Sequence, residues 1–563
     1  MHRHVGIAIL LIASACDGGT ELAGLEARQA QGSVQITVAE GGGTPGTSQH
    51  FKLVGHDPLF SRGMNAAPAF FSRYVYIGNR SDGSNSCGDL NAAGPVVPVI
   101  TPTNPDGTCT HVHPGVLVVD TANPHHPEVV GEFGNEFVTG ANVGQTSREL
   151  RVLPDQKLLM VMYFRCSRVI HDCSRSAQSF RIRFFDIGAN PVNPPLVATY
   201  VPTLLPHEMF VWVDPNDRHR VLLWISAPNS SVDPNVPNLI ITDISRAKEG
   251  VFTEIARGNW NQLFPGAEDP ANYDFDLALH SMTPSFDGTR TYLAYLRGGF
   301  GVLDTTDVAR NRVPPGTTAS LNDKLITPAP FPTWGTGPVC AGHTAAACGE
   351  SHSAVPFPGR HFAFTIDEVY GTFTVPSFGW PWGWARMWDI ADPTQPQLVA
   401  EYKIRENAPA FQGSAGDDAA TEQFTSYSSH DPTMTRNLII EAWHSGGLQA
   451  IDVSNPRRPR QAGWFSPTPL SSVALEDPAL SRGPNKVVVW SFPIIRDGLI
   501  YVVDIRNGLY ILQYTGKHSH EVSGVRFLEG NSNLGDAGRI AGHGDDGEDG
   551  EDDEDDEDDD RDN

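Results

Sequence analysis

Basic residues are scarce in this sequence: 40 Lys and Arg stand against 66 Asp and Glu in 563 residues. Fifteen of the acids lie in the last 19 residues, Asp545 to Asn563. No stretch gathers enough positive charge to offset a phosphate backbone, which argues against a nucleic-acid partner. By its composition we expect the segment 531–563 to be a disordered acidic tail.

Several motifs that mark common enzyme classes are also missing. There is no GxSxG nucleophile motif. The glycine-rich stretch "LRGGFG", Leu296 to Gly301, lacks the GxGxxG spacing of a dinucleotide-binding motif. CxxC spacing, which a thiolate metal site would favour, is absent as well. The chemistry of this chain, if it has any, must therefore come from other residue types.

The apolar segment Val5 to Ala15 is too short to cross a membrane. With its basic start and small residues at the end, it predicts a signal peptide over 1–15 and an exported protein. "ASAC" resembles a bacterial lipobox, so we expect Cys16 to carry lipid and to anchor the protein in the bacterial cell envelope. Ordinary cleavage near Ala15 is the alternative. Residues 16–47 are expected to be a tether.

Cysteine is rare, and its spacing is regular. Apart from Cys16, the cysteines fall into near-neighbour pairs. In an exported protein an even number of cysteines is most simply explained by disulfides. The predicted pairs are Cys87 with Cys109, Cys166 with Cys173, and Cys340 with Cys348.

What the chain does contain is a repeat. The phrase "GVLVVDTANP" returns as "RIRFFDIGANP", "NLIITDISRA", "GFGVLDTTDV", "ARMWDIADP" and "GLQAIDVSNP", and ends in a degenerate "GLYILQYTG". Aspartate before Ser, Asn or Pro is turn chemistry, because its carboxylate accepts backbone N–H groups two residues on. The repeats are 57 to 85 residues apart. The anchor positions are Asp120, Asp186, Asp243, Asp304, Asp389, Asp452 and Gln513.

Each repeat also holds two earlier strand-like runs and one later run, which makes four strands per unit. Sheets of this kind bury both faces when they stack radially. We therefore predict an all-β fold, a single seven-bladed β-propeller of four-stranded blades over residues 48–530.

The runs "VLVVD", "IITDI", "LQAIDVSNP" and "ARMWDIADPTQP" resemble the LVIVD repeat family of bacterial exported β-propellers, over roughly residues 50–530. More distantly, the pattern is similar to selenium-binding protein, the methanethiol oxidase propeller, whose members use histidines and a copper cofactor. The resemblance implies an exported propeller, and its more distant part implies a metal held by histidines.

Histidines recur at one position of consecutive units, where the first and innermost strand begins: "LPHEMFVWV", "LHSMTPSF", "ESHSAVPF" and "SSHDPTM". These residues are His207, His280, His352 and His430. Other units have Met64, Arg148 with Glu149, and Trp490 at this position. His444 lies in a loop that opens on the same face, so we expect five histidines at one mouth of the central channel.

Neutral imidazole is a common ligand of Zn, Cu and Fe, so this cluster predicts a transition-metal site. Carotenoid-cleaving oxygenases offer a family-level analogy, since they hold iron with four histidines on a propeller. Nearby acids are expected to orient the imidazoles. These acids are Glu149, Glu208, Glu350 and Asp431. The structural alternative stays open, because WD-type propellers keep a hydrogen-bonded His in each blade without a metal.

Two classes of function follow from these patterns. The first is a metal-dependent propeller, with an oxidoreductase acting on a small molecule as one form of it. The second is a non-catalytic cell-surface scaffold that binds a protein or glycan partner. The sequence identifies no catalytic residue and does not settle whether the chain is an enzyme.

Overall fold

The computed structural model describes most of the chain between residues 34 and 542. The described residues are 34–80, 88–89, 97–98, 112–138, 145–165, 180–264, 277–296, 298–332, 351–368, 370–371, 378–411, 413–414, 425–475, 483 and 485–542. The six paired cysteines, Cys16, Glu350 and the signal segment lie outside them. The predictions of disulfides, lipidation and a signal peptide therefore stay predictions.

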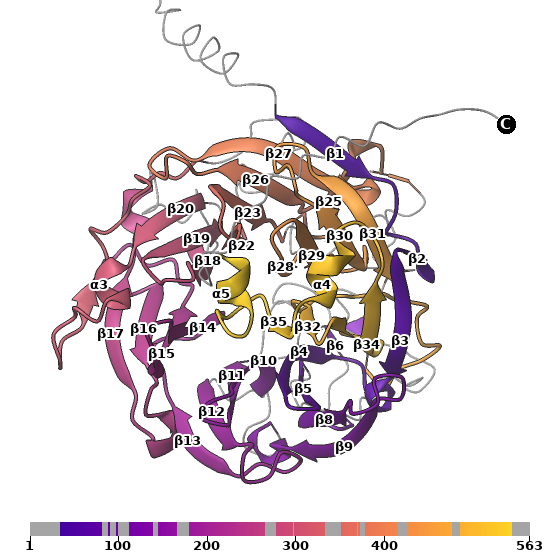
Figure 1. Cartoon of the computed structure of the whole chain (residues 1–563), viewed down its shortest axis with the longest axis horizontal. Coiled ribbons are helices and arrows are strands. Elements are labelled where there is room, and N and C mark those ends of the chain that lie inside the picture. The colour runs from indigo at the N-terminus through magenta and orange to yellow at the C-terminus, as the bar shows by residue number, and fades with distance from the viewer. Residues whose placement is uncertain are drawn as a thin grey trace, which may run out of the picture.

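The sheets stand side by side around a central axis (Figure 1). The eight-stranded sheet contains β4 (Asn65–Phe71), β5 (Tyr74–Asn79), β8 (Val116–Asp120), β9 (Glu128–Phe133), β10 (Gln145–Leu153), β11 (Leu158–Arg165), β12 (Arg181–Asp186) and β13 (Leu196–Tyr200). The next sheet contains β14 (Met209–Asp214), β15 (Asp217–Ser226), β16 (Leu239–Asp243), β17 (Thr253–Gly258) and β21 (Ala319–Ser320). The three-stranded sheet contains β18 (Ala278–Pro284), β19 (Arg290–Leu296) and β20 (Gly299–Asp304).

Three further sheets complete the circle, and each takes one strand from the N-terminal region. The first contains β1 (Gln35–Ala39), β27 (Gln397–Ile404), β26 (Ala385–Asp389), β23 (Phe362–Ile366) and β22 (Ser353–Pro356). The second contains β2 (Thr47–Gln49), β31 (Arg460–Ser466), β30 (Leu448–Asp452), β29 (Leu438–Ala442) and β28 (Pro432–Met434). The third contains β3 (Phe51–Asp57), β34 (Gly508–Tyr514), β33 (Leu499–Asp504), β32 (Ile494–Arg496) and β35 (Phe527–Leu528).

The remaining elements are small. Two-stranded sheets pair β6 (Gly88–Asp89) with β7 (Val97–Pro98), and β24 (Tyr370–Gly371) with β25 (Phe378–Trp382). The α-helices of the described residues are α3 (Thr306–Ala309), α4 (Ser519–Ser523) and α5 (Ala537–Ile540). Short 3-10 turns span Leu59–Ser61, Asn135–Phe137, Ala247–Glu249, Asn261–Leu263, Arg405–Asn407 and Pro409–Phe411. Within the described residues, no helix is long and apolar enough to cross a membrane.

The predicted β-propeller is confirmed, but the prediction of uniform four-stranded blades is wrong. In the described part of the chain the radial sheets hold three, five or eight strands. One reason is that N-terminal strands add to sheets made much later in the sequence. β1 runs parallel to β27, while β2 and β3 pair antiparallel with β31 and β34. The first of these strands lies inside the segment that we expected to be a tether.

The core lies between neighbouring sheets. Alternate residues of β11 show this plainly, because Leu159 and Val161 pack in one hydrophobic cluster while Met160 and Met162 pack in the next. Successive side chains of a strand point to opposite faces, so a strand covered on both faces reads as a continuous apolar run. This is why repeat phrases such as "GVLVVD" read as continuous apolar runs.

The aspartates that anchor the repeat have the predicted turn role. Each ends the third strand of its unit, and its Oδ1 accepts a hydrogen bond of 2.8 to 3.0 Å from the N–H group two residues later. These residues are Asp120, Asp186, Asp243, Asp304, Asp389 and Asp452. The turn prediction is confirmed at all six.

Residues 515–542, which we call the C-terminal strap, lie over the centre of the molecule (Figure 1). β35 pairs with β32, and Ser532 forms a bridge with Val211 on another sheet. Asn533 adds two hydrogen bonds of 2.8 Å to the backbone of Val213. The predicted start of the disordered tail at residue 531 is therefore too early, because described structure with α5 continues to Gly542.

Candidate metal centre

The four repeated histidines lie at the beginnings of neighbouring inner strands, in β14, β18, β22 and β28 or just before them. Three of them share one backbone contact. The N–H groups of His207, His352 and His430 donate 2.8 to 2.9 Å hydrogen bonds to the last residue of the second strand in each unit. The acceptors are Ser226, Ile366 and Ala442. The common register predicted from sequence is therefore a common backbone geometry.

The imidazoles gather at one end of the inner strands. Ring centroids are 4.3 Å apart for His207 and His280, 3.9 Å for His280 and His352, and 4.3 Å for His352 and His430. His444 joins from the loop after β29, with its ring 5.3 Å from that of His430. All five predicted histidines therefore lie in one cluster.

Other side chains extend these contacts into a closed circle, which we call the mouth ring. The ring of Trp490 is 4.9 Å from that of His430, and the ring of Phe164 is 5.2 Å from that of His207. The guanidinium of Arg148 joins these two aromatic rings, at 5.2 and 5.0 Å from their centroids. The mouth ring consists of His207, His280, His352, His430, Trp490, Arg148 and Phe164.

The centre of the cluster is a glutamate that sequence reasoning missed. Glu368 places Oε2 3.4 Å from Nε2 of His352. Its other oxygen, Oε1, lies 3.5 Å from Nε2 of His430 and 3.3 Å from Nε2 of His444. One signal could have found it: Glu368 follows the end of β23 by two residues, and His444 follows the end of β29 by two residues.

The tautomer of His352 follows from its neighbours. Ser353 Oγ donates its one hydrogen to Asp431 Oδ1 at 3.1 Å, because a carboxylate can only accept. The same oxygen lies 2.8 Å from Nδ1 of His352, so it must accept that bond from Nδ1–H. Nε2 of His352 is then the lone-pair nitrogen, and this nitrogen faces Glu368. Asp431 also lies 3.3 Å from Nδ1 of His430 and orients both rings.

His444 is held in a similar way. Its Nδ1 lies 2.8 Å from the hydroxyl oxygen of Ser426, which leaves Nε2 facing Glu368. Its backbone has φ of +33°, a conformation that residues with a Cβ rarely adopt. Strain of this kind gathers at functional sites.

Burial keeps most of these imidazoles neutral. It lowers the pKa of His280 to about 4 and holds the pKa values of His207 and His352 well below their ordinary value. Burial also acts on His430, but the carboxylates of Asp431 and Glu368 outweigh it and raise its pKa. Although burial opposes charge on Glu368, the neighbouring imidazoles hold its pKa well below the usual range. Apart from His430, whose raised pKa favours the protonated form, the imidazoles therefore present neutral nitrogens to a carboxylate.

This arrangement fits a metal ion. Two atoms that each bind one tetrahedral ion at about 2.1 Å lie roughly 3.4 Å apart, and the distances from Glu368 to His352, His430 and His444 are 3.3 to 3.5 Å. The potential ligands form three overlapping groups whose atoms lie within 4.8 Å of one another. These groups are His207 with Glu208 and His280, His280 with His352 and Glu368, and Glu368 with His430 and His444.

His207 and His280 contact each other directly. Their Nε2 atoms are 2.7 Å apart, which is a hydrogen-bond distance and is shorter than two ligands of one tetrahedral ion require. The strongest ligand set in the structure is therefore centred on Glu368, whereas sequence reasoning had centred it on the four repeated histidines.

The predicted orienting acids differ in what they contact. Asp431 orients imidazoles, as described above. Glu208 is a potential ligand beside His207 and His280. Glu149 instead pairs with the buried Arg151, at 3.1 Å from its Nη1, and forms no hydrogen bond with an imidazole of the described residues. Its interpretation as an orienting residue therefore has no support in these contacts.

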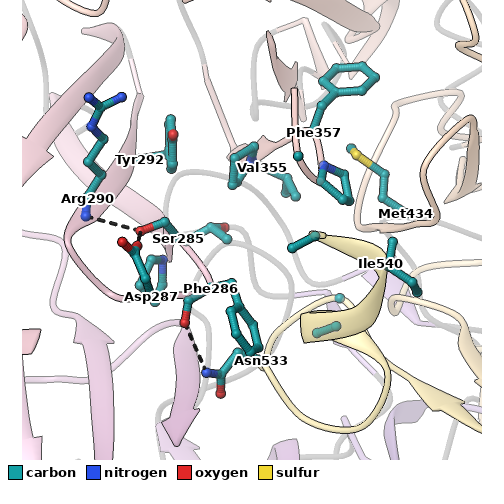
Figure 2. A pocket seen from close by; sticks show the side chains of 18 of the residues that line it. Ser285, Phe286, Asp287, Arg290, Tyr292, Val355, Phe357, Met434, Asn533 and Ile540 are labelled. Carbon is teal, nitrogen blue, oxygen red and sulfur yellow. Dashed lines mark hydrogen bonds between the residues drawn. The ribbon is translucent and has the colours of Figure 1, made fainter. Parts of the chain in front are cut away.

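A separate cavity of about 450 Å³ lies at the other end of β18, where the C-terminal strap covers the inner strands (Figure 2). Much of its lining is apolar, and the figure shows Phe286 close to Asn533 of the strap. The apolar residues include Phe286, Val355, Phe357, Met434 and Ile540. None of the clustered histidines lines it, so this cavity is distinct from the candidate metal centre.

Comparisons with known proteins add little. No family model matches this chain, and no curated protein matches it. Among solved structures, the β-propeller domain of Cps50 (Swd1) from Myceliophteria thermophila has 10% identity, 80% coverage of this chain, 96% of its own and a TM-score of 0.36. A chain of the mitotic checkpoint complex has 8% identity, 85% and 97% coverage and a TM-score of 0.38. The fold assignment therefore rests on the sheet arrangement itself.

Proposed function

We propose that this chain is a metalloprotein whose transition-metal centre lies at the mouth ring, with Glu368 as the central ligand. His352, His430 and His444, whose Nε2 atoms face Glu368, would hold the ion together with it. His280 stands beside His352 as a further ligand. Copper, iron and zinc all accept this mixture of imidazole and carboxylate.

One observation carries the proposal. The lone-pair nitrogen of His352 and a carboxylate oxygen of Glu368 face each other at 3.4 Å, although neither atom carries a hydrogen to share. Two acceptors in this position, one buried and one largely buried, repel each other unless a positive species lies between them. A metal ion supplies that charge at a suitable separation.

The expected class of activity is an oxidoreductase that acts on a small molecule. Copper and iron at such a site supply one-electron and oxygen chemistry, and a bound ion also acts as a Lewis acid. The chain's own part is to fix the tautomer of His352 through Ser353 and Asp431, to hold the ring of His444 through Ser426, and to surround the site with aromatic side chains.

We also infer that the propeller has seven blades. The eight-stranded sheet consists of two groups of four strands, β4 with β5, β8 and β9, and β10 with β11, β12 and β13. A single residue pair, Asn79 with Ser147, joins them. Counting the groups as separate blades gives one for each repeat anchor.

The location of the protein is proposed from sequence alone. We propose an exported LVIVD-type propeller that Cys16 attaches to the bacterial cell envelope through lipid. Replacing Cys16 by Ala should move the protein from the membrane fraction to the soluble fraction. Unchanged membrane association would contradict the lipid anchor.

The metal proposal is tested by metal analysis. The wild type, Glu368→Gln and the control His125→Ala would be loaded in parallel with Zn(II), Fe(II) or Cu(II) and separated from free metal. His125 is exposed in a turn remote from the cluster, so its loss removes an imidazole but no ligand. We expect the wild type and His125→Ala to retain a stoichiometric amount of one metal and Glu368→Gln to lose it. Equal metal contents in all three proteins would contradict the proposal.

A further inference from the structure

The mouth ring contains one permanent cation. Arg148 lies at an irregularity of β10 between Ser147 and Glu149, just as His280 lies at an irregularity of β18 between Leu279 and Ser281. The two residues therefore occupy equivalent positions on different inner strands. At this position β18 carries the imidazole of His280, and β10 carries the guanidinium of Arg148.

The contacts of this guanidinium are unusual for a partly buried arginine. It lies over the rings of Phe164 and Trp490, at 5.0 and 5.2 Å. Within the described residues it has no hydrogen-bond or ion-pair partner. Aromatic contacts use the faces of a guanidinium, while its N–H donors point outward in its plane. These donors are therefore available to a ligand.

The surroundings strengthen the case for a negative ligand. A second arginine, Arg80, lies 4.8 Å from the centroid of the same Trp490 ring. Burial, followed by the positive charge of Arg80, lowers the pKa of Arg148 to about 10, although the carboxylates of Glu149, Glu208 and Glu368 oppose this shift. Two cations at one indole repel each other, and an anion bound in the plane of Arg148 offsets this repulsion.

The position relative to the histidines points to a substrate. Trp490 contacts both Arg148 and His430, and Phe164 contacts both Arg148 and His207. A molecule whose anionic end binds Arg148 thus extends its remaining atoms toward the imidazoles and Glu368. A planar carboxylate matches the paired N–H groups of a guanidinium best.

We propose that Arg148 is the anion-binding residue of this site and that the substrate is a small molecule with a carboxylate or another oxyanion. The role of this anion as a substrate rests on the proposed metal centre. Binding of the anion at Arg148 does not depend on the metal centre, because Arg148 is not one of the proposed metal ligands.

The test uses the full-length, metal-free protein and thermal unfolding at constant ionic strength. Acetate is the probe, and acetamide is its neutral counterpart of the same shape. We expect acetate to raise the unfolding temperature and acetamide to leave it unchanged. Sulfate and phosphate are added in separate arms to distinguish a carboxylate site from a general oxyanion site. If none of the three anions stabilises the wild type, the proposal is wrong.

Two variants locate the effect. Arg148→Gln should weaken acetate binding about 10- to 100-fold, the loss expected for charge-assisted hydrogen bonds. Arg148→Lys keeps the charge without the paired geometry and should bind acetate less tightly than the wild type but more tightly than the Gln variant. Arg218→Gln is the control, because Arg218 is exposed and pairs with Asp155. Equal acetate binding by the wild type and Arg148→Gln would overturn the assignment.

Metal analysis of the same variants separates the two proposals. We expect Arg148→Gln to retain as much metal as the wild type. If no protein retains metal but acetate binding still depends on Arg148, the metal proposal fails while the anion site stands. If metal is retained but acetate binding does not depend on Arg148, the anion site fails alone.

Discussion

Nε2 of His444 lies 3.3 Å from Oε1 of Glu368, and each residue stands two positions beyond the second strand of its unit. The two loops belong to neighbouring sheets. At the same backbone position, the loop after β23 carries the carboxylate of Glu368 and the loop after β29 carries the imidazole of His444. His430 and His352 approach the same carboxylate from the inner strands. Glu368 is thus the meeting point of two loops and two strands.

The first prediction concerns the ranking of ligands. Glu368 belongs to two of the three potential ligand groups, so Glu368→Gln should remove most of the bound metal. His207→Ala should remove less, because the nearest partner of His207 is His280 rather than the carboxylate. Metal content after gel filtration measures both. A larger loss from His207→Ala than from Glu368→Gln would contradict the central role of Glu368.

The second prediction concerns orientation. Asp431→Asn should lower metal affinity about 10- to 100-fold, because Asp431 positions His430 directly and His352 through Ser353. Competition with a chelator of known affinity measures the change. Glu149→Gln is the matched control: it should destabilise the fold by about 3 kcal/mol by weakening the buried pair with Arg151, but it should leave metal affinity nearly unchanged. Similar affinity losses in both variants would argue against a specific role of Asp431.

The third prediction concerns pH. Burial lowers the pKa of His280 to about 4 and those of His207 and His352 well below their ordinary value. In the unfolded chain these groups titrate near pH 6.5, so between about pH 6.5 and 4 the unfolded state binds more protons than the folded state. The stability of the metal-free protein should therefore be fully present above about pH 6.5 and fall as the pH decreases toward 4.

Denaturant unfolding at a series of pH values measures this slope. A variant with both His280→Gln and His352→Gln should lose stability less steeply over the same range, whatever its stability at neutral pH. If the slopes of the wild type and the double variant are the same, these imidazoles are not the groups responsible.

The fourth prediction concerns the repeat itself. Asp304→Ala removes the acceptor of the Thr306 N–H group, at 2.9 Å, and should destabilise the fold by about 1 kcal/mol. Thermal unfolding measures the change, and metal content should stay the same because Asp304 lies at the end of its sheet opposite His280. Asp307→Ala, on an exposed side chain nearby, serves as the control. A loss of metal in Asp304→Ala would mean that the turns support the site more directly than we infer.

Much of the fold could be predicted because the same turn-forming aspartate recurs in six units of the repeat. The aspartate at the end of each third strand acts locally, through an N–H group two residues away. The sheet edges could not be predicted in this way. β1, β2 and β3 pair with strands more than 360 residues later, and no local pattern encodes such partners.

The same distinction between repeated local patterns and long-range contacts applies to the candidate site. The histidines were found because they repeat at one register, and the structure places them together. Glu368 does not repeat: its counterpart after β29 is a histidine, so no shared residue type marks the position. Its role depends on which loops meet at the mouth ring, and this is a property of the closed circle of sheets rather than of any one unit.

The most direct test of the account is anomalous diffraction from crystals of the metal-loaded protein, collected on both sides of the absorption edge of the bound metal. We predict a peak about 2.0 to 2.3 Å from a carboxylate oxygen of Glu368 and from Nε2 of at least two of His352, His430 and His444. Metal retained by the protein with no anomalous peak among these side chains would contradict it.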